Sequence, residues 1–199
     1  MKRGQKKNSF NLLEEYKNCW KYLGESKKFI WIILGVFLLF VLIGFFISPP
    51  EFIYNKILEF IKELLETTKD MSGLELIQFI IFNNLQSTLF GIFLGLLFGI
   101  FPVFSAIANG YLLGFVSSIS VQQDGILSLW KLFPHGIFEL PAVFISLGLG
   151  LKLGTFIFQK KKLESLKNYA INSLKIFLLI IVPLLIIAGI IEGILIYFS

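Results

Sequence analysis

The amino-acid sequence predicts an all-α protein, a polytopic membrane helical bundle with about five transmembrane helices and one amphipathic interfacial helix. The 199 residues are 56% hydrophobic and have a mean hydropathy of +0.80, whereas soluble domains are about 45–50% apolar. All but two of the Lys, Arg, Asp and Glu residues lie in segments that can stay outside the hydrocarbon core. The apolar stretches between those segments are long enough to cross a bilayer.

Prolines divide the apolar sequence into separate spans. Ser48-Pro49-Pro50 ends the first span, because proline cannot continue the hydrogen-bond ladder of a helix. Pro102 divides a second apolar region that is too long for one crossing. Pro134 and Pro141 allow a broken or re-entrant outer end of the fourth span. The predicted spans cover about residues 29–47, 76–100, 103–118, 132–158 and 176–198, within a single membrane domain of residues 29–199.

Two segments outside the spans have amphipathic patterns. In residues 51–70, apolar side chains occupy one helical face and charged ones the opposite face: Ile53, Ile57, Phe60, Ile61, Leu64 and Leu65 against Glu51, Glu59, Lys62, Glu63 and Glu66. This pattern is typical of a helix lying in a membrane interface. Residues 1–28 carry eight basic side chains and a partial apolar stripe, which predicts a short basic helix on the membrane surface. A solvated tail is the alternative for that segment.

The distribution of basic residues predicts the orientation. Eight lie in residues 1–28 and six in residues 152–175, against three in residues 48–75 and one in residues 119–131. Because cytoplasmic loops are enriched in Lys and Arg, we predict a multi-pass protein of the cell membrane with a cytoplasmic N-terminus and an outside C-terminus. The net charge of +5 then reflects contact with membrane lipids, and no nucleic-acid partner is expected.

Ionisable groups inside the membrane are the main candidates for a functional site, because their burial is costly. Glu139 and Glu192 lie inside apolar stretches, and the only histidine, His135, precedes Glu139 by one helical turn. At 1.5 Å per residue, these groups and three asparagines fall roughly 5–15 Å below the outer surface. The sequence therefore predicts one polar cluster near the outer leaflet: His135, Glu139, Glu192, Asn83, Asn84 and Asn109.

Three interpretations of this cluster remain open. It is a hydrogen-bonded core that fixes helix register, a site for a solute, lipid headgroup or proton, or a metal site formed by His135, Glu139 and Glu192. The metal site would be unusual, because no second histidine completes a zinc set. No cofactor is expected, and no catalytic arrangement of nucleophile and base is evident. The single cysteine, Cys19, excludes an intrachain disulfide.

Small residues recur at a spacing that lets helices approach closely. The predicted packing positions are Gly91, Gly95, Gly99, Gly110 and Gly114. We expect the first three to pack within the chain, with span two against span three across the turn at Pro102. Gly189 and Gly193 on span five are the candidates for a homodimer.

The run Pro134-His135-Gly136-Ile137-Phe138-Glu139-Leu140-Pro141-Ala142, followed by a glycine-rich stretch, resembles the stage II sporulation protein M family. Asn83-Asn84 before Gly91 and Gly95, and Asn109-Gly110 before Gly114, fit the same pattern. The resemblance covers residues 29–198 and implies a multispan integral membrane protein. It also implies, for spore-forming bacteria, a role in the peptidoglycan-remodelling engulfment machinery beside a cell-wall hydrolase pair. Members also occur in organisms that make no spores, so only the fold and membrane location are carried over.

Our leading expectation is a non-enzymatic scaffold or assembly component, with a second copy or a membrane-protein or envelope partner. The alternatives are a transporter or a protein that handles lipids or small ligands, and a metal-dependent intramembrane enzyme. A fully hydrogen-bonded cluster favours the scaffold. An open cavity at the cluster favours ligand handling, and a bound ion at His135 and Glu139 favours the enzyme.

Overall fold

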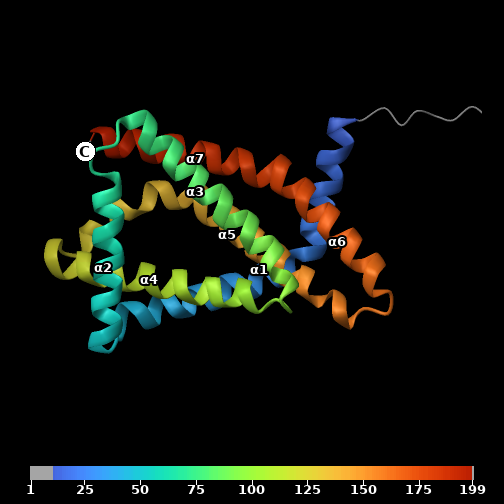
Figure 1. Ribbon diagram of the computed structural model, residues 1–199, viewed down its shortest axis with the longest axis horizontal. Helices are drawn as coiled ribbons and strands as arrows, with labels where there is room; N and C mark the ends of the chain where they lie inside the picture. Colours follow the sequence, from blue (N-terminus) through green and yellow to red (C-terminus); the bar gives the residue numbers. More distant parts are fainter. Residues whose placement is uncertain (1–10, 199) are drawn as a thin grey trace, which may run out of the picture.

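Every regular element in the described part of the chain is a helix, which confirms the all-α prediction (Figure 1). The computed structural model describes residues 11–198, without the side chains of residues 130–135, 193 and 195–198. The α-helices are α1 (Leu12–Phe46), α2 (Glu51–Thr68), α3 (Gly73–Phe93), α4 (Ile100–Asp124), α5 (Phe133–Gly154), α6 (Lys162–Ile176) and α7 (Val182–Phe198). Short 3₁₀ and π segments join them: η1 (Leu94–Leu96), η2 (Ile126–Leu132), η3 (Thr155–Phe158) and η4 (Phe177–Ile181).

Five helical stretches in this part of the chain are long and apolar enough to cross a membrane: Leu12–Phe46, Gly73–Leu96, Ile100–Asp124, Gly136–Phe158 and Lys162–Glu192. Figure 1 shows most of their length along the long axis of the molecule, whereas α2 lies across one end. The start of α1 and the α5–α6 connection lie at the opposite end from α2, η2 and the C-terminus. The two basic segments of the sequence therefore share one end, hereafter the basic end.

Two boundaries that the sequence predicts at the basic end differ from those in the structure. The helix of the N-terminal segment does not stop at residue 28 but continues into the first span as α1, and Asn11 caps it by accepting a hydrogen bond from the Leu13 amide (3.2 Å). Residues 1–10 lie outside the described part. The basic linker before the fifth span is the helix α6, which runs through η4 into α7. Pro183 follows the π segment directly. Proline has no amide hydrogen to donate, and a π turn is one of the helix irregularities that accommodate this loss.

The turn between α3 and α4 comes earlier than predicted. It lies over residues 94–99, where Phe98 and Gly99 adopt positive φ angles of 57° and 73°. Pro102 is in the first turn of α4, where a missing amide hydrogen costs no helical bond. At the other end of the bundle, α5 continues through Pro141 without a break. The irregular outer end expected for span four is the 3₁₀ segment η2 instead.

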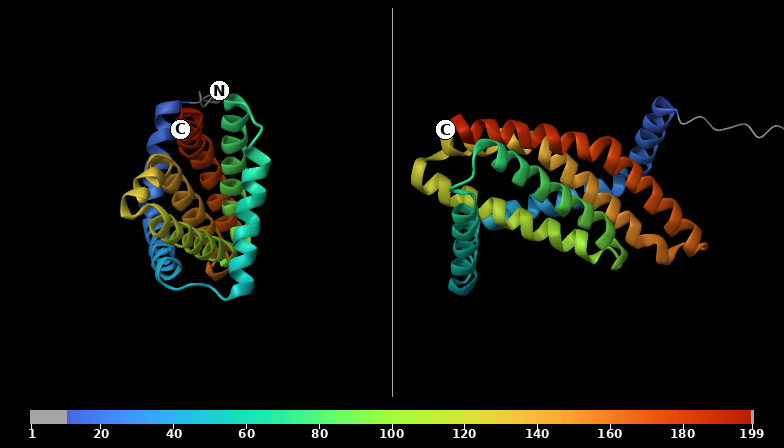
Figure 2. Two further views of the ribbon diagram at one scale, coloured as in Figure 1. Left: turned by 90° about the vertical axis from the view of Figure 1, so that its left-hand side faces the viewer. Right: turned by 45° about the horizontal axis from the view of Figure 1, so that its top comes forward.

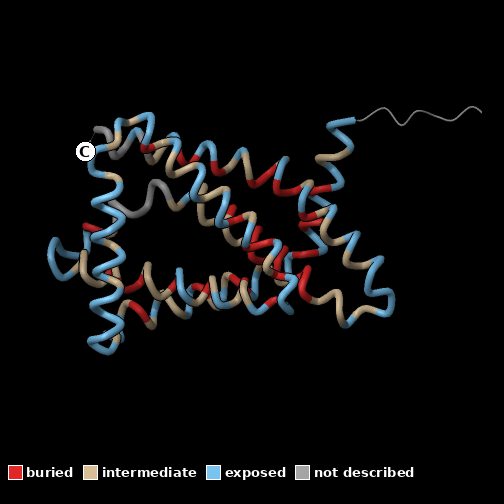
Figure 3. The backbone as a smooth tube through the Cα atoms, viewed as in Figure 1, coloured by how far each residue is buried: buried red, intermediate tan, exposed pale blue. Residues whose placement is uncertain are grey.

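Helix α5 forms the centre of the bundle. It packs against α1, α3, α4 and α7, and it contains a continuous buried stretch from Ser146 to Gly150. Buried residues concentrate where α5 meets α1, α6 and the α6–α7 junction (Figure 3). Helix α2 has no buried residue, and Phe52 on it is 74% exposed. The predicted amphipathic helix thus forms, and its contact with the bundle is partial: Tyr54 packs against Phe115 of α4, with the ring centroids 5.4 Å apart, while most apolar side chains of α2 stay exposed.

Candidate intramembrane polar site

A cavity of about 210 Å³ lies between α3, α4 and α5, inside the predicted membrane region. Its walls carry three asparagines and one glutamate of the predicted cluster: Asn83, Asn84, Asn109 and Glu139. The other lining residues were not members of the predicted cluster, although Ser87 shares a helix face with Asn83: Ser87, Thr88, Ser105, Val143, Ser146 and Leu147. The hydroxyls among them could have been found by their spacing from the predicted residues along each helix.

Helical periodicity explains how each helix presents several of these groups. On α4, Ser105 and Asn109 are four residues apart, and on α5 Glu139, Val143 and Ser146 are separated by four and three residues. Residues at these spacings share a helix face. The cavity is therefore formed by three polar faces that meet, and each face comes from one span.

Internal hydrogen bonds orient part of the lining. Asn109 Nδ2 donates to the Ser105 carbonyl oxygen (2.8 Å) and to Ser105 Oγ (3.2 Å). Thr88 Oγ1 donates to the Asn84 carbonyl oxygen (2.7 Å), and Ser146 Oγ donates to the Thr88 carbonyl oxygen, which joins α5 to α3. No hydrogen bond within the described residues occupies the side-chain amide of Asn83 or Asn84.

Tight backbone packing closes the cavity on the side of the α3–α4 turn. A Cβ added to Gly95 would lie 2.6 Å from the Gly150 Cα, and one added to Gly154 would lie 2.6 Å from the Gly95 carbonyl oxygen. A Cβ added to Gly150 would lie 3.0 Å from Cγ of the Pro102 ring of α4. We call this contact between Gly91, Gly95, Gly99, Gly150 and Gly154 the glycine seam.

The glycine seam corrects the predicted partner of span two. Gly91, Gly95 and Gly99 pack within the chain, but against α5 rather than against α4. Gly110 packs against the Phe37 backbone of α1, where an added Cβ would lie 2.5 Å from the carbonyl oxygen. Gly114 packs against α1 as well. The tight α3–α4 turn brings the two helix ends together, and the helices then diverge (Figure 1).

Of the remaining members of the predicted cluster, Glu192 is not among the lining residues that the structure describes. Glu192 is on α7 and half-buried. Gly189, three residues earlier, lies against Ile81 of α3 inside the chain. The side chain of His135 lies outside the described residues, as does Gly193. Within the described part of the chain, no group of three or more His, Cys, Asp or Glu side chains could hold a metal ion.

One buried ionisable residue was missed by the sequence analysis. Lys152 was counted with the basic linker, but it is inside α5 and only 7% exposed. One feature of the sequence could have indicated its burial: Lys152 lies within the predicted span 132–158, six residues before the end of that apolar stretch.

The fold and the cavity define a polytopic α-helical membrane protein with a polar site inside the bundle. A sequence model described as Stage II sporulation protein M matches residues 33–195, so the chain belongs to that family. It is 31% identical over 176 residues to an uncharacterized protein of Methanocaldococcus jannaschii, a match that covers 84% of this chain and 77% of the relative. No solved structure matches the chain. The resemblance drawn from the Pro134–Ala142 run is confirmed.

Proposed function

We propose that this member of the family handles a small ligand in the cavity around Glu139. The observation that carries the proposal is the cavity itself: polar groups from three spans line an open space instead of filling it. A polar cluster that served only to fix helix register would be expected to fill the space between the helices and leave no such cavity. The arrangement therefore favours ligand handling over the purely structural alternative.

The size and chemistry of the cavity limit the ligand. Its volume of about 210 Å³ is below the roughly 300–1,000 Å³ of typical drug-sized pockets and corresponds to about seven water molecules at about 30 Å³ each. Among the described lining residues, Glu139 carries the one ionisable side chain, and amide and hydroxyl groups form the rest of the polar wall. A carboxylate beside amide oxygens suits a small cation or a primary amine, either free or as part of a lipid headgroup.

The test is ligand-dependent stabilisation of the purified protein. Sodium, magnesium, ethanolamine and choline are the probes, and the unfolding temperature in detergent is the readout. At least one of these cations should raise the unfolding temperature of the wild type. Glu139→Gln preserves the shape of the side chain but removes its charge, so it should abolish that rise and fold normally without ligand.

Glu192→Gln is the matched control, because Glu192 is a half-buried carboxyl that does not line the cavity. It should keep the cation response. The proposal fails if none of the probes stabilises the wild type, or if Glu139→Gln and the wild type respond alike. If the cluster is structural, Glu139→Gln should be stable and Glu139→Leu destabilised, because the polar partners would lose their hydrogen bonds.

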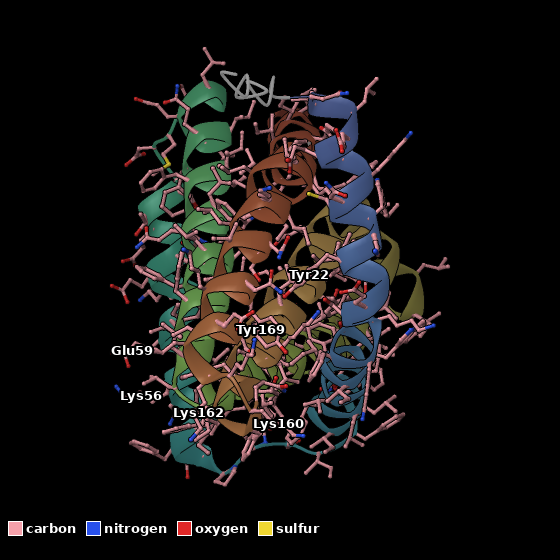
Figure 4. The ribbon with its side chains drawn as sticks, turned by 90° about the vertical axis from the view of Figure 1, so that its right-hand side faces the viewer. Tyr22, Lys56, Glu59, Lys160, Lys162 and Tyr169 are labelled. Atoms are coloured by element: carbon pink, nitrogen blue, oxygen red, sulfur yellow. The ribbon has the colours of Figure 1, made fainter. Side chains whose placement is uncertain are left out.

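A scaffold or assembly role is the second candidate, and α2 favours it. Its apolar side chains are exposed, and its charged side carries a Lys56–Glu59 ion pair of 2.8 Å. The hydrogen bond from Lys56 lowers the pKa of Glu59 and keeps this side charged. In Figure 4 both labelled side chains point away from the bundle. A second copy or a membrane-protein partner would use this helix, and mass photometry of the purified protein tests for the homodimer.

A further inference from the structure

Lys152 lies among side chains of three helices at the basic end of the bundle. Its Nζ donates a hydrogen bond to Ser26 Oγ of α1 (2.9 Å). The same atom is 3.6 Å from the centre of the Tyr22 ring of α1 and 5.4 Å from that of the Tyr169 ring of α6. Figure 4, viewed from the basic end, shows Tyr22 and Tyr169 in the middle of the molecule between α1 and α6.

The ammonium group forms no ion pair with a carboxylate of the described residues, although Glu25 on α1 attracts its charge from farther away. None of their ion pairs includes Lys152, although Lys175 nearby on α6 pairs with Glu15 at 2.7 Å. Glu25, next to Ser26 on α1, is exposed and beyond salt-bridge distance. An ammonium group has three donors, and only one is used by Ser26. A buried charge that forms no ion pair is unfavourable, so an additional anionic group near Lys152 would stabilise it.

Two hydroxyl groups of the same region also have no partner. Tyr22 Oη and Ser173 Oγ are buried, and neither forms a hydrogen bond within the described residues. Tyr22 is only 6% exposed, and its ring is the one that Lys152 Nζ contacts most closely. Buried polar groups are normally satisfied, so an unpaired hydroxyl beside an unpaired charge indicates a missing acceptor. An anionic oxygen could accept from both Lys152 and Tyr22.

The surroundings indicate which anion fits. Lys152 lies two residues before the end of α5, near the expected boundary between membrane and water. Exposed lysines follow it in sequence at residues 160–162 and 167, and others precede Ser26 or follow it on α1 at residues 21, 27 and 28. Basic pockets between transmembrane helices at this depth bind phosphate-bearing headgroups.

We propose that Lys152 and Tyr22 bind one oxygen of a phosphate group at the basic end of the bundle. Ser26 orients the ammonium group, and the exposed lysines attract the anion to the junction of α1, α5 and α6. Because Lys152 and Tyr22 are only 7% and 6% exposed, a single phosphate oxygen enters between them, and the rest of the headgroup stays beside the exposed lysines. Lys152 lies 13 positions after Glu139 on α5, about 20 Å at 1.5 Å per residue, so the two sites are separate.

The experiment compares three additives on delipidated, detergent-purified protein: dioleoylphosphatidylglycerol, dioleoylphosphatidylcholine and inorganic phosphate. The readout is the unfolding temperature as a function of additive concentration. Phosphatidylglycerol should stabilise the wild type at lower concentration than phosphatidylcholine. A shift of similar size with millimolar inorganic phosphate would identify free phosphate as the source, and no such shift would identify the lipid.

Matched variants assign the effect to the site. Tyr22→Phe removes only the unpaired hydroxyl and should raise the half-saturating concentration about tenfold, as expected for one hydrogen bond to a charged group. Lys152→Gln should abolish the response, whereas Lys167→Gln, an exposed lysine on α6, should retain it. If Lys152→Gln does not fold, Tyr22→Phe tests the proposal alone. This variant retains the aromatic ring and is therefore expected to fold. The proposal is overturned if the two lipids stabilise the wild type at the same concentration and inorganic phosphate does not stabilise it. It is also overturned if Tyr22→Phe has the same half-saturating concentration as the wild type.

Discussion

Glu15 and Lys175 are 160 positions apart in sequence, yet Lys175 Nζ lies 2.7 Å from Glu15 Oε2. The pair joins the beginning of α1 to the end of α6, the two segments that sequence analysis treated as a separate surface helix and a linker. It lies at the basic end of the bundle, where Ser26 and Lys152 also connect α1 to α5.

This ion pair should contribute little to stability. The two side chains are 42% and 23% exposed, and pairs of this kind typically give about 0.2–1 kcal/mol. We expect a double-mutant cycle with Glu15→Gln and Lys175→Gln to give a coupling in this range. The coupling should decrease in 1 M NaCl, because salt screens exposed charges. Chemical unfolding in detergent measures it, and a coupling that is insensitive to salt would contradict the prediction.

The glycine seam should tolerate no side chain. An alanine Cβ at position 95 would meet the Gly150 backbone at 2.5–2.6 Å, so Gly95→Ala should destabilise the protein by about 1–3 kcal/mol or more. Gly35→Ala is the control, since no atom lies within 4 Å of its added Cβ. It should be neutral or stabilise α1 by about 0.5–1 kcal/mol. Equal unfolding temperatures for the two variants would refute the close contact.

The basic end should face the cytoplasm. In a Cys19→Ser background, which has no other cysteine, we introduce Ser165→Cys or Asp124→Cys. A membrane-impermeant maleimide applied to intact cells should label position 124 and leave position 165 unlabelled until the cells are opened. The reverse pattern would show that the count of basic residues predicts the wrong orientation.

Helix α2 should lie in the interface with its apolar face toward the lipid. In Figure 2 it runs along one side of the bundle seen end-on. Nitroxide labels at Phe60 and Glu63 in reconstituted protein test this orientation by their collision rates with oxygen and with a water-soluble nickel chelate. The label at position 60 should favour oxygen and the label at position 63 the chelate. Equal accessibility at both positions would mean that α2 stands clear of the membrane.

The spans could be predicted from sequence because charge is expensive in hydrocarbon and proline interrupts helices. The depth calculation placed several polar residues together, and Asn83, Asn109 and Glu139 do line one cavity. The order of the helices around the bundle could not be read from depth. For this reason Glu192, at a similar predicted depth, was grouped with the cavity although it lies on α7, and the glycines of α3 were paired with α4 instead of α5.

Lys152 shows a different limit. A lysine near the end of an apolar stretch can extend its charge to water, so counting it with the basic linker was reasonable by composition. The structure buries it because the helix α6 folds back over the end of α5 and α1 crosses beside it. Those contacts depend on tertiary packing over more than one hundred residues of sequence, and no local pattern encodes them.

The glycine seam also affects how easily protons and ions could leak through the protein. A hydrated carboxylate below the outer surface of a bilayer offers protons and ions a partial path across it. Where a rotating side chain forms the barrier of such a path, a single rotamer change can open it. Here Gly95, Gly150 and Gly154 bring two backbones into direct contact, so only separation of α3 from α5 could open a passage. Water at Glu139 would then not by itself open a path for ions across the membrane.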